Sequence, residues 1–378
     1  MSERIYLDNN ATTFCDARVV EEMCKVLSSN MGNSSSVHAM GQEAKACLLE
    51  AQRTAGAVLD VSPNSLIFTS GGTEGINYCL RGLPRGHVVT SCVEHSAVDA
   101  TLSVLEGQGV AVTRVAVGEV GAPHLDEIAR AIRPETAFLV LIAANNETGV
   151  LSDLEPIAKL AAERGIPLVL DGVSWLGKEP IPKLPGKVFW CFSAHKIHGP
   201  TGVGIVVVPA GVKVEPLMTG GPQQQGRRGG TENVAGIVGF ATALSVMQQD
   251  FESERERVRA LRDRFESHIC GSLDGIRVNG SGKRLGNTSN LAFDGVDGET
   301  LLYVLDREGI AASMGSACNS GAVEPSRVLM QMGYSRERVL SSLRFSLSRL
   351  TTQSEIDRAS EIIVEQVIRF RAKQGLKS

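Results

Sequence analysis

The stretch that decides the fold runs from residue 188 to residue 202 and reads VFWCFSAHKIHGPTG. It begins with five residues that are apolar or Cys, without the alternation of a half-exposed strand, so it predicts a strand buried on both faces. Ser193, His195 and Lys196 follow within four residues, and a glycine-containing turn comes next. Open α/β sheets form ligand sites at the carboxyl ends of their strands, so we expect Lys196 to lie in such a site.

Similar short apolar segments occur on both sides of this stretch. They predict strands at 66–69, 87–90, 110–113, 138–142, 168–170 and 202–209. Apolar residues at helical spacing predict helices over 16–27 and 41–59, and the region 232–271 is mainly helical in pattern. This alternation predicts an α/β fold, with a mostly parallel seven-stranded sheet flanked by helices.

The pattern changes after residue 271. Strand-like segments at 276–278, 290–293 and 343–347 are interleaved with helical segments near 297–308, 325–332 and 353–370. We therefore expect a second, smaller α/β domain. The predicted division gives a large domain over 14–250 and a small domain made of 1–13 and 251–378.

Composition excludes several classes of protein. The chain has 378 residues, of which 43% are hydrophobic, and a net charge of -4, so it has no basic surface for nucleic acid. No apolar run approaches the ~20 residues of a membrane span, and the N-terminus lacks a signal sequence, so we expect a cytoplasmic protein. The eight cysteines form no CxxC pair, which argues against a metal site and a disulfide framework. We expect most of them to be buried.

Lys196 and Asp171 suggest covalent chemistry with a cofactor. Burial at the strand end would lower the pKa of Lys196 and favour the neutral amine that forms Schiff bases. Ser193 and His195 beside it could donate hydrogen bonds to a phosphate. Asp171 ends the strand at 168–170, where a protonated pyridine nitrogen would compensate a buried carboxylate. The alternatives are a surface lysine in a loop and an aspartate that caps the next helix.

Three neighbouring segments fit the same site. The segment FTSGGTEG, 68–75, leads from strand to helix, so the backbone around Gly72 and the Thr73 hydroxyl could bind an anion. His95 follows the strand at 87–90 and could stack on an aromatic ring, although a lone histidine is more often structural. Asn146 follows the strand at 138–142.

Two residues in the second half suggest a reactive thiol and a carboxylate site. Cys318 lies in SMGSACNSG, 313–321, whose small and polar residues predict a mobile loop. Its reactive form would be the thiolate. Arg344 interrupts an apolar strand and could bind a substrate carboxylate in bidentate fashion, or face solvent on an edge strand.

Together these segments resemble the fold-type I pyridoxal-phosphate (PLP) enzymes of the class V aminotransferase group, and specifically the cysteine desulfurases of the NifS and IscS kind. The resemblance runs from LDNNATT, 7–13, to the strand of Arg344. It implies that Lys196 carries the cofactor, Asp171 pairs with its pyridine nitrogen and His95 stacks on its ring. Gly72, Thr73, Ser193 and His195 would hold the phosphate. Ser174 stands where the family usually has a glutamine that binds the phenolic oxygen.

The resemblance also implies a substrate and partners. Asn146 and Arg344 would bind the carboxylate of L-cysteine, and Cys318 would take its sulfur, leaving alanine and a persulfide; Lys196, Cys318 and His95 are then the catalytic residues. Thr231 would reach the phosphate in a neighbouring subunit, which implies a homodimer. The sulfur would pass to an acceptor or iron-sulfur scaffold protein and supply iron-sulfur cluster assembly and other thio-cofactors. IscS-type enzymes help engage their scaffold through a tail longer than the one that follows the last predicted helix here. The resemblance therefore supports the chemistry more strongly than it supports a scaffold partner.

Two alternatives remain. A selenocysteine lyase or another enzyme of the class V aminotransferase group would share Lys196, Asp171 and the phosphate site. A non-catalytic assembly protein on the same scaffold would explain the exchange at Ser174. The presence of Lys196 and Cys318 argues against this second alternative.

Overall fold

The computed structural model describes residues 4–29, 31–315, 324–373 and 375. Within these residues lies a seven-stranded sheet with the strand order β2-β8-β7-β6-β5-β3-β4. The strands are β2 (Leu66–Thr69), β3 (His87–Ser91), β4 (Val112–Val115), β5 (Thr136–Ile142), β6 (Leu168–Asp171), β7 (Val188–Ser193) and β8 (Gly204–Val207). β8 is antiparallel to both of its neighbours, and the other pairs are parallel. The predicted seven-stranded, mostly parallel sheet is confirmed.

One strand begins two residues later than predicted. The segment 110–113 was expected to pair, but the backbone N–H of Val110 donates to Leu105 O at 3.0 Å and closes the end of the preceding helix, α4 (Ser96–Glu106). Pairing with β3 therefore starts at Val112. β4 is the edge strand of the sheet, and three of its four residues are half-buried.

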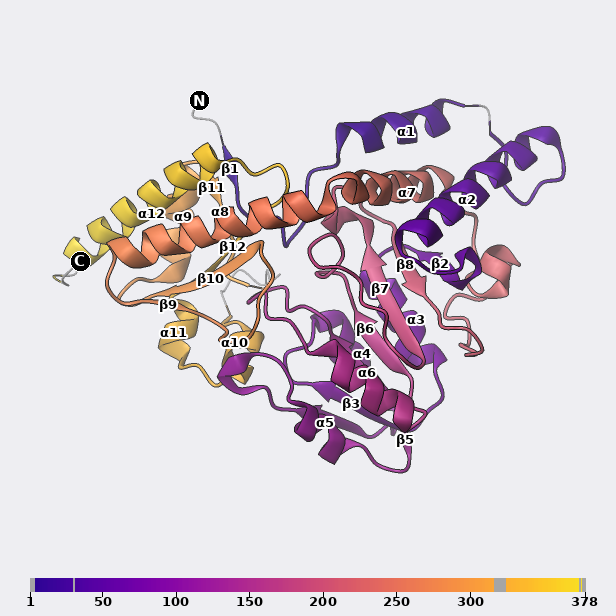
Figure 1. Ribbon diagram of the computed structural model, residues 1–378, viewed down its shortest axis with the longest axis horizontal. Coiled ribbons are helices and arrows are strands. Elements are labelled where there is room, and N and C mark those ends of the chain that lie inside the picture. Colours follow the sequence, from indigo (N-terminus) through magenta and orange to yellow (C-terminus); the bar gives the residue numbers. More distant parts are fainter. Residues whose placement is uncertain (1–3, 30, 316–323, 374, 376–378) are drawn as a thin grey trace.

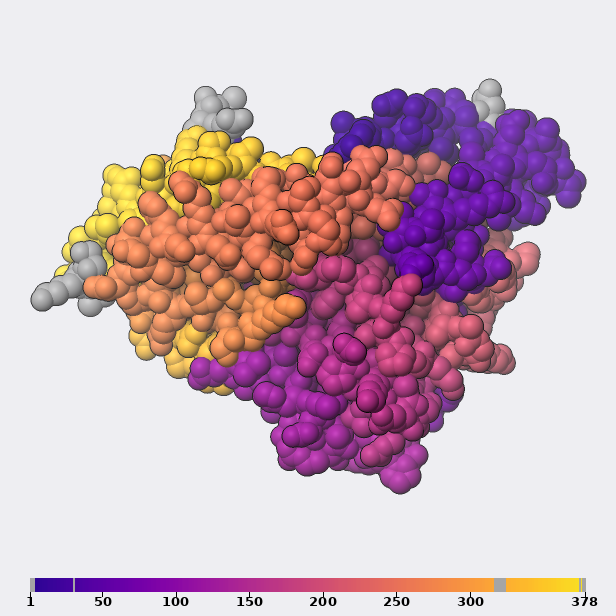
Figure 2. All heavy atoms as spheres, viewed as in Figure 1, coloured from indigo at the N-terminus to yellow at the C-terminus, as the bar shows by residue number. Residues whose placement is uncertain are grey.

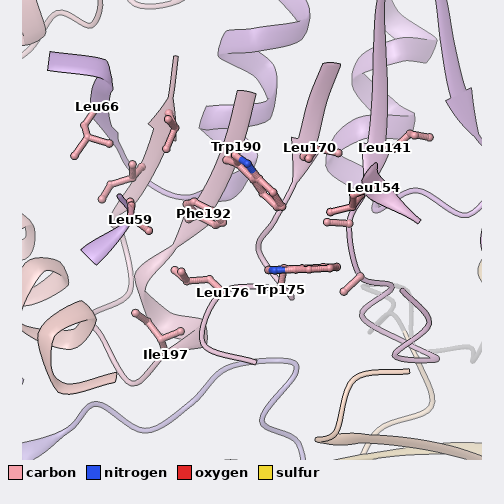
Figure 3. Close-up of a cluster of buried hydrophobic side chains, with 14 of the residues drawn as sticks. Leu59, Leu66, Leu141, Leu154, Leu170, Trp175, Leu176, Trp190, Phe192 and Ile197 are labelled. Atoms are coloured by element: carbon pink, nitrogen blue, oxygen red, sulfur yellow. The ribbon is translucent and has the colours of Figure 1, made fainter. Parts of the chain in front are cut away.

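Helices cover both faces of this sheet (Figure 1). On one face pack α2 (Ala39–Val58), α6 (Leu154–Glu163) and α7 (Val234–Gln249); on the other pack α3 (Gly72–Gly82) and α4. Strand β7 contributes to both hydrophobic layers, since Trp190 and Phe192 point to the first and Phe189 and Cys191 to the second. Figure 3 shows Trp190 and Phe192 in the first layer, where their rings stack with centroids 5.5 Å apart. The strand is thus buried on both faces, as its sequence predicts.

A second sheet has the strand order β12-β10-β9, formed by β9 (Ile276–Val278), β10 (Thr288–Phe293) and β12 (Ser342–Ser346). Its hydrophobic core includes residues of α8 (Phe251–Ser272), α9 (Gly298–Arg307) and α12 (Gln353–Lys373). The short helices α10 (Arg327–Gln331) and α11 (Arg336–Leu340) lie between β11 (Ile310–Ala311) and β12. The long α8 leads from α7 to this second sheet (Figure 1). On the face seen in Figure 2, the atoms around the second sheet lie directly against those around the seven-stranded sheet. The division into domains at residues 13 and 250 remains our proposal.

The N-terminal segment belongs to this second core. Strand β1 (Ile5–Tyr6) pairs in parallel with β11, and Ile5 and Leu7 are buried among the residues of β10 and β12. Neither of these two-residue strands was predicted. The segment then runs along β12, where Asp8 forms an isolated bridge with Ser346.

Three of the seven described cysteines are buried, namely Cys79, Cys92 and Cys191. Cys15, Cys24 and Cys270 are exposed, because they lie on the outer side of the chain before and within α1 (Ala17–Ser28) and near the end of α8. The expectation that most cysteines are buried was therefore wrong. In the described part of the chain, no helix meets the length and apolarity of a membrane span, and no cluster of His, Cys, Asp and Glu could hold a metal ion.

Candidate active site

A cavity of about 250 Å³ lies at the carboxyl ends of the parallel strands. Most of the residues singled out in the sequence line it: Gly72, Thr73, His95, Asn146, Asp171, Ser174, Ser193, His195 and Lys196. They come from segments spread over more than 120 positions of the chain, and the sheet brings them together because parallel strands end at one edge. Ala11, Ile76, Ile142 and Val173 complete the lining.

Lys196 is held at the end of β7 by a single turn of 3-10 helix, Ala194–Lys196. Its Nζ donates hydrogen bonds to the carbonyl oxygens of Asn10 and Ala11, the latter at 2.8 Å. Burial, helped by the charge of Arg344, lowers the pKa of Lys196 to about 8. A neutral amine is therefore accessible close to neutral pH, which suits a lysine that forms a covalent bond with a carbonyl compound.

His195 is fixed by the N-terminal segment. Its Nδ1 lies 3.1 Å from Thr12 Oγ1, and its carbonyl oxygen accepts hydrogen bonds from the backbone N–H of Thr13, at 3.0 Å, and from the Thr13 hydroxyl, at 2.8 Å. Burial lowers the pKa of His195 to about 4, with a further contribution from the charge of Lys196. The imidazole is neutral at pH 7, so one ring nitrogen can donate a hydrogen bond and the other can accept one.

Asp171 is the last residue of β6 and is buried. Its Oδ1 accepts a 3.0 Å hydrogen bond from the backbone N–H of Val173, so one oxygen does cap the following turn, as the alternative interpretation expected. The carboxyl also faces the cavity. Burial raises the pKa of Asp171, and the hydrogen bond from Val173 and the charge of Lys196 oppose this rise. A cationic ring nitrogen in the cavity would compensate the carboxylate further.

The first turn of α3 forms an anion cradle beside Ser193. Gly72 and Thr73 are its first residues, and a helix start leaves backbone N–H groups free for an anion. Gly72 is required by close packing, because a Cβ there would lie 2.4 Å from Cγ2 of Val173. The acidic Glu74 in the same turn is neutralised by Arg228, with Nε and Oε1 2.9 Å apart. The donors and this narrow approach fit a phosphate group.

His95 and Asn146 line the cavity from neighbouring strands. Nδ1 of His95 accepts a 3.1 Å hydrogen bond from the backbone N–H of Ala97, so the residue caps α4 in addition to facing the cavity. The carbonyl oxygen of Asn146 accepts hydrogen bonds from Asn10 Nδ2, at 3.0 Å, and from Arg344. The position of His95 is thus compatible both with a structural role as a helix cap and with a role in contacting an aromatic ring in the cavity.

Arg344 lies beside this cavity rather than in its lining. Its side chain is 3% exposed, so the alternative of a solvent-facing arginine on an edge strand is wrong. One guanidinium nitrogen donates to Asn146 O at 3.1 Å, and another lies 2.7 Å from the carboxylate of Asp8. β12 is indeed an edge strand, but the segments around Asp8 and Ser313 cover it.

Besides Arg344, one predicted residue is outside the cavity lining, and another lies outside the described residues. Thr231 is exposed and does not line the cavity of its own chain. Cys318 lies outside the described residues, so its predicted mobile loop and its role remain predictions from the sequence.

Sequence reasoning assigned no role to several residues around the site. Lys178 donates to the carbonyl oxygen of Lys196 at 3.4 Å, and burial together with the charge of Lys196 lowers its pKa to about 7. Glu94 is buried, accepts a 2.5 Å hydrogen bond from Ser91, and has a pKa raised by burial to about 8. Asp8 and Asn10 belong to the motif at 7–13, which predicts no contact for either of them. Glu94 precedes His95 in the sequence, shortly after the end of β3. Its position as a charged residue just past a strand was the signal that could have indicated a role in the site.

Comparisons with known proteins agree with this geometry. Residues 5–359 match the family model described as aminotransferase class-V. A cysteine desulfurase of Nostoc sp. is 40% identical over 99% of this chain and 95% of its own length. A cysteine desulfurase IscS of Methanosarcina thermophila is 37% identical over 98% of this chain and 93% of its own.

Solved structures give the same result. A NifS-like protein superposes with a TM-score of 0.90 at 33% identity and covers 97% of this chain and 99% of its own. A NifS-like protein from Rickettsia africae has a TM-score of 0.86 at 28% identity, over 97% and 100% of the two chains. The resemblance inferred from the motifs is confirmed.

Proposed function

The chain belongs to the aminotransferase class-V family, and we propose that it is a PLP-dependent cysteine desulfurase, which converts L-cysteine to L-alanine and transfers the sulfur to a thiol of the enzyme. The observation that carries this proposal is the shared cavity of Lys196 and Asp171. Lys196 and Asp171 follow or end two adjacent strands, and both line the same cavity. The pKa of the lysine is lowered to about 8, and the carboxyl group of the aspartate is buried.

The side chains that line the cavity fit the cofactor. Lys196 would hold it covalently, and Asp171 would pair with its ring nitrogen. The first turn of α3, with Thr73, Ser193 and His195, would bind its phosphate, and His95 would contact its ring. When bound, PLP supplies an electron sink for the bonds at the substrate Cα.

The chain's own residues then perform the remaining tasks. Arg344 and Asn146 orient the substrate by its carboxylate, as bidentate guanidinium geometry allows. The Nζ of Lys196 accepts the Cα proton and later returns a proton to the carbon that becomes the alanine methyl group; a second proton, taken up from water, restores the Cα–H bond. The carbonyl oxygens of Asn10 and Ala11 aim this Nζ and stabilise its protonated form.

Sulfur leaves the substrate through Cys318. Its thiolate attacks the sulfur of L-cysteine, an S–S bond forms as the Cβ–S bond breaks, and the electron pair stays with the carbon fragment. The products are L-alanine and a persulfide on Cys318, so one sulfur atom is transferred and no external oxidant or reductant is consumed. The assignment of Cys318 rests on the sequence motif.

We extend the proposal to the assembly and setting of the enzyme. Thr231 would complete the phosphate site of a neighbouring subunit in a homodimer, and its exposure away from the cavity of its own chain supports this role. The persulfide would supply a sulfur acceptor or iron-sulfur scaffold protein in the cytoplasm.

The direct test is turnover of L-cysteine by the PLP-loaded protein, with alanine and sulfide measured together. Alanine should form at the same rate as total sulfur is released in the presence of a thiol reductant. Lys196→Ala should abolish both products, whereas the matched control Lys187→Ala, at an exposed lysine, should retain them. Absence of alanine from the loaded wild-type protein would refute the proposed function.

A further inference from the structure

Arg344 already has a carboxylate partner in the protein. Among the described residues it forms one ion pair, in which its guanidinium nitrogen lies 2.7 Å from Asp8 Oδ1. The arginine side chain is 3% exposed and that of Asp8 is 21% exposed, so water screens this pair only weakly. The Nε of Arg344 is buried and has no partner within the described part of the chain. One guanidinium nitrogen is thus bonded to the protein's own carboxylate.

The carboxylate of Asp8 is not a mobile surface group. Leu7 and Asn9, on either side of it, are both bonded to Ser346 of β12: Ser346 N donates to Leu7 O at 2.7 Å, and Asn9 N donates to Ser346 O at 3.2 Å. Arg344 lies two residues before Ser346, so its side chain is on the same face of the strand. The backbone on both sides therefore fixes the distance between Asp8 and Arg344.

The other carboxyl group near Arg344 has a different partner. Glu147 is buried, its Oε2 accepts a hydrogen bond from the Ser326 hydroxyl, and burial raises its pKa. Arg344 in turn also donates to the carbonyl oxygen of Asn146, at 3.1 Å. Asp8 is therefore the carboxylate that is paired with Arg344 among the described residues.

We propose that Asp8 is a positioning and specificity-determining residue, which holds Arg344 and restricts the site to amino acids with a single negative group. This inference rests on the proposed binding of the substrate carboxylate to Arg344. The first carboxylate meets a guanidinium and is attracted. Once this first carboxylate has neutralised the guanidinium, a second carboxylate on the side chain of the same amino acid meets the fixed negative charge of Asp8. The repulsion between these like charges disfavours binding.

The test compares two isosteric ligands that differ in one charge, L-aspartate and L-asparagine. Dissociation constants are measured from the change in cofactor absorbance of the PLP-loaded protein, so the test does not depend on turnover. The wild type should prefer asparagine. Asp8→Asn should shift the ratio of the two constants toward aspartate by about tenfold or more. Asp8→Glu, which keeps the charge, should retain the wild-type preference.

The control is Asp60→Asn, which removes the same charge from an exposed aspartate that pairs with Lys183 at the surface. Its ratio should equal that of the wild type. A ratio unchanged in Asp8→Asn, or changed equally in Asp8→Glu and Asp8→Asn, would overturn the inference. Alanine formation from L-cysteine by the wild type is recorded separately, so a failure of the proposed function is distinguishable from a failure of this assignment.

Discussion

The Nζ of Lys196 donates a 2.8 Å hydrogen bond to the carbonyl oxygen of Ala11, 185 positions earlier in the chain. The bond joins the end of β7 to the segment that also carries Asp8 and Asn10. It gives the amine a fixed direction at the end of the strand. The reactivity of Lys196 is therefore controlled by the N-terminal segment as well as by the sheet.

The first prediction concerns the pH dependence of cofactor capture by the apoprotein. The pKa of Lys196 is lowered to about 8 by burial and by the charge of Arg344. The neutral amine is the nucleophile, so the rate of cofactor attachment should rise as the pH increases through about 8. Stopped-flow absorbance on mixing with PLP measures this profile.

The matched variants are Arg344→Gln and Arg344→Lys. Removal of the charge should move the midpoint to higher pH, and the lysine variant should stay close to the wild type. Because the folded pKa lies below that of an unfolded lysine, the unfolded chain binds the proton more tightly between pH 8 and 10.5. This group's contribution to apoprotein stability should therefore increase with pH across that interval.

The second prediction concerns the glycine of the anion cradle. In Gly72→Ala the new Cβ would lie 2.4 Å from Cγ2 of Val173, so the first turn of α3 or the turn after β6 must move. Such overpacking costs about 1–3 kcal/mol of the free energy of unfolding. We expect a lower melting temperature and faster loss of cofactor on dialysis.

A second substitution separates the clash from other effects. Val173→Ala combined with Gly72→Ala removes the close contact, so the double variant should regain cofactor retention. Gly271→Ala is the control, since a Cβ there meets no atom within 4 Å and lies in α8. If the double variant loses cofactor as fast as Gly72→Ala, the steric explanation is wrong.

The third prediction concerns Thr231 and the proposed dimer. Thr231→Ala should release the cofactor faster while leaving the melting temperature of the apoprotein unchanged, because the side chain is exposed in its own chain. Light scattering gives the oligomeric state, and absorbance after dialysis gives the cofactor content. A monomeric wild type with full activity would disprove the shared site.

The fourth prediction concerns Cys318. Cys318→Ser should bind PLP and still change its absorbance with L-cysteine, since neither step uses the thiol, but it should lose nearly all persulfide and alanine formation. Mass spectrometry of cysteine-treated wild type should find an additional sulfur on the peptide that contains Cys318.

Cys270→Ser is the matched control for this thiol. Cys270 is exposed, but partial burial of its sulfur and the charge of Glu266 raise its pKa, so it should react slowly. Its replacement should leave alanine formation intact. An additional sulfur found on another cysteine, or normal alanine output from Cys318→Ser, would show that the nucleophile has been misassigned.

The large sheet was predictable because continuous apolar segments such as β5 and β7 identify buried strands by their own sequence, without knowledge of the strands they pair with. It placed β4 two residues early, since the capping bond of Val110 depends on where α4 ends. The region 232–271 was expected to be mainly helical, and the structure divides it at Asp250, whose φ of -127° and ψ of 28° are not helical. The cavity-lining residues were predictable because the ends of parallel strands meet.

The contacts of Asp8 were not predictable in the same way. They depend on the pairing of β1 with β11, and two residues carry too little pattern to show a strand. The pairing of Asp8 with Arg344 joins positions 336 apart and follows no periodicity. The contact of Lys178 with the carbonyl oxygen of Lys196 likewise depends on the path of the folded chain.

The position of β12 near the end of the chain separates two events in the order of synthesis. All residues that line the cavity have been translated once Lys196 has left the ribosome, whereas Arg344 and its bond to Asp8 become available only with β12. The oldest and one of the youngest parts of the nascent chain must therefore meet before Asp8 can pair with the arginine that we propose binds the substrate carboxylate. A chain that terminates between α7 and β12 carries Thr231 and all the residues that line the cavity, but it lacks Arg344 and its ion pair with Asp8.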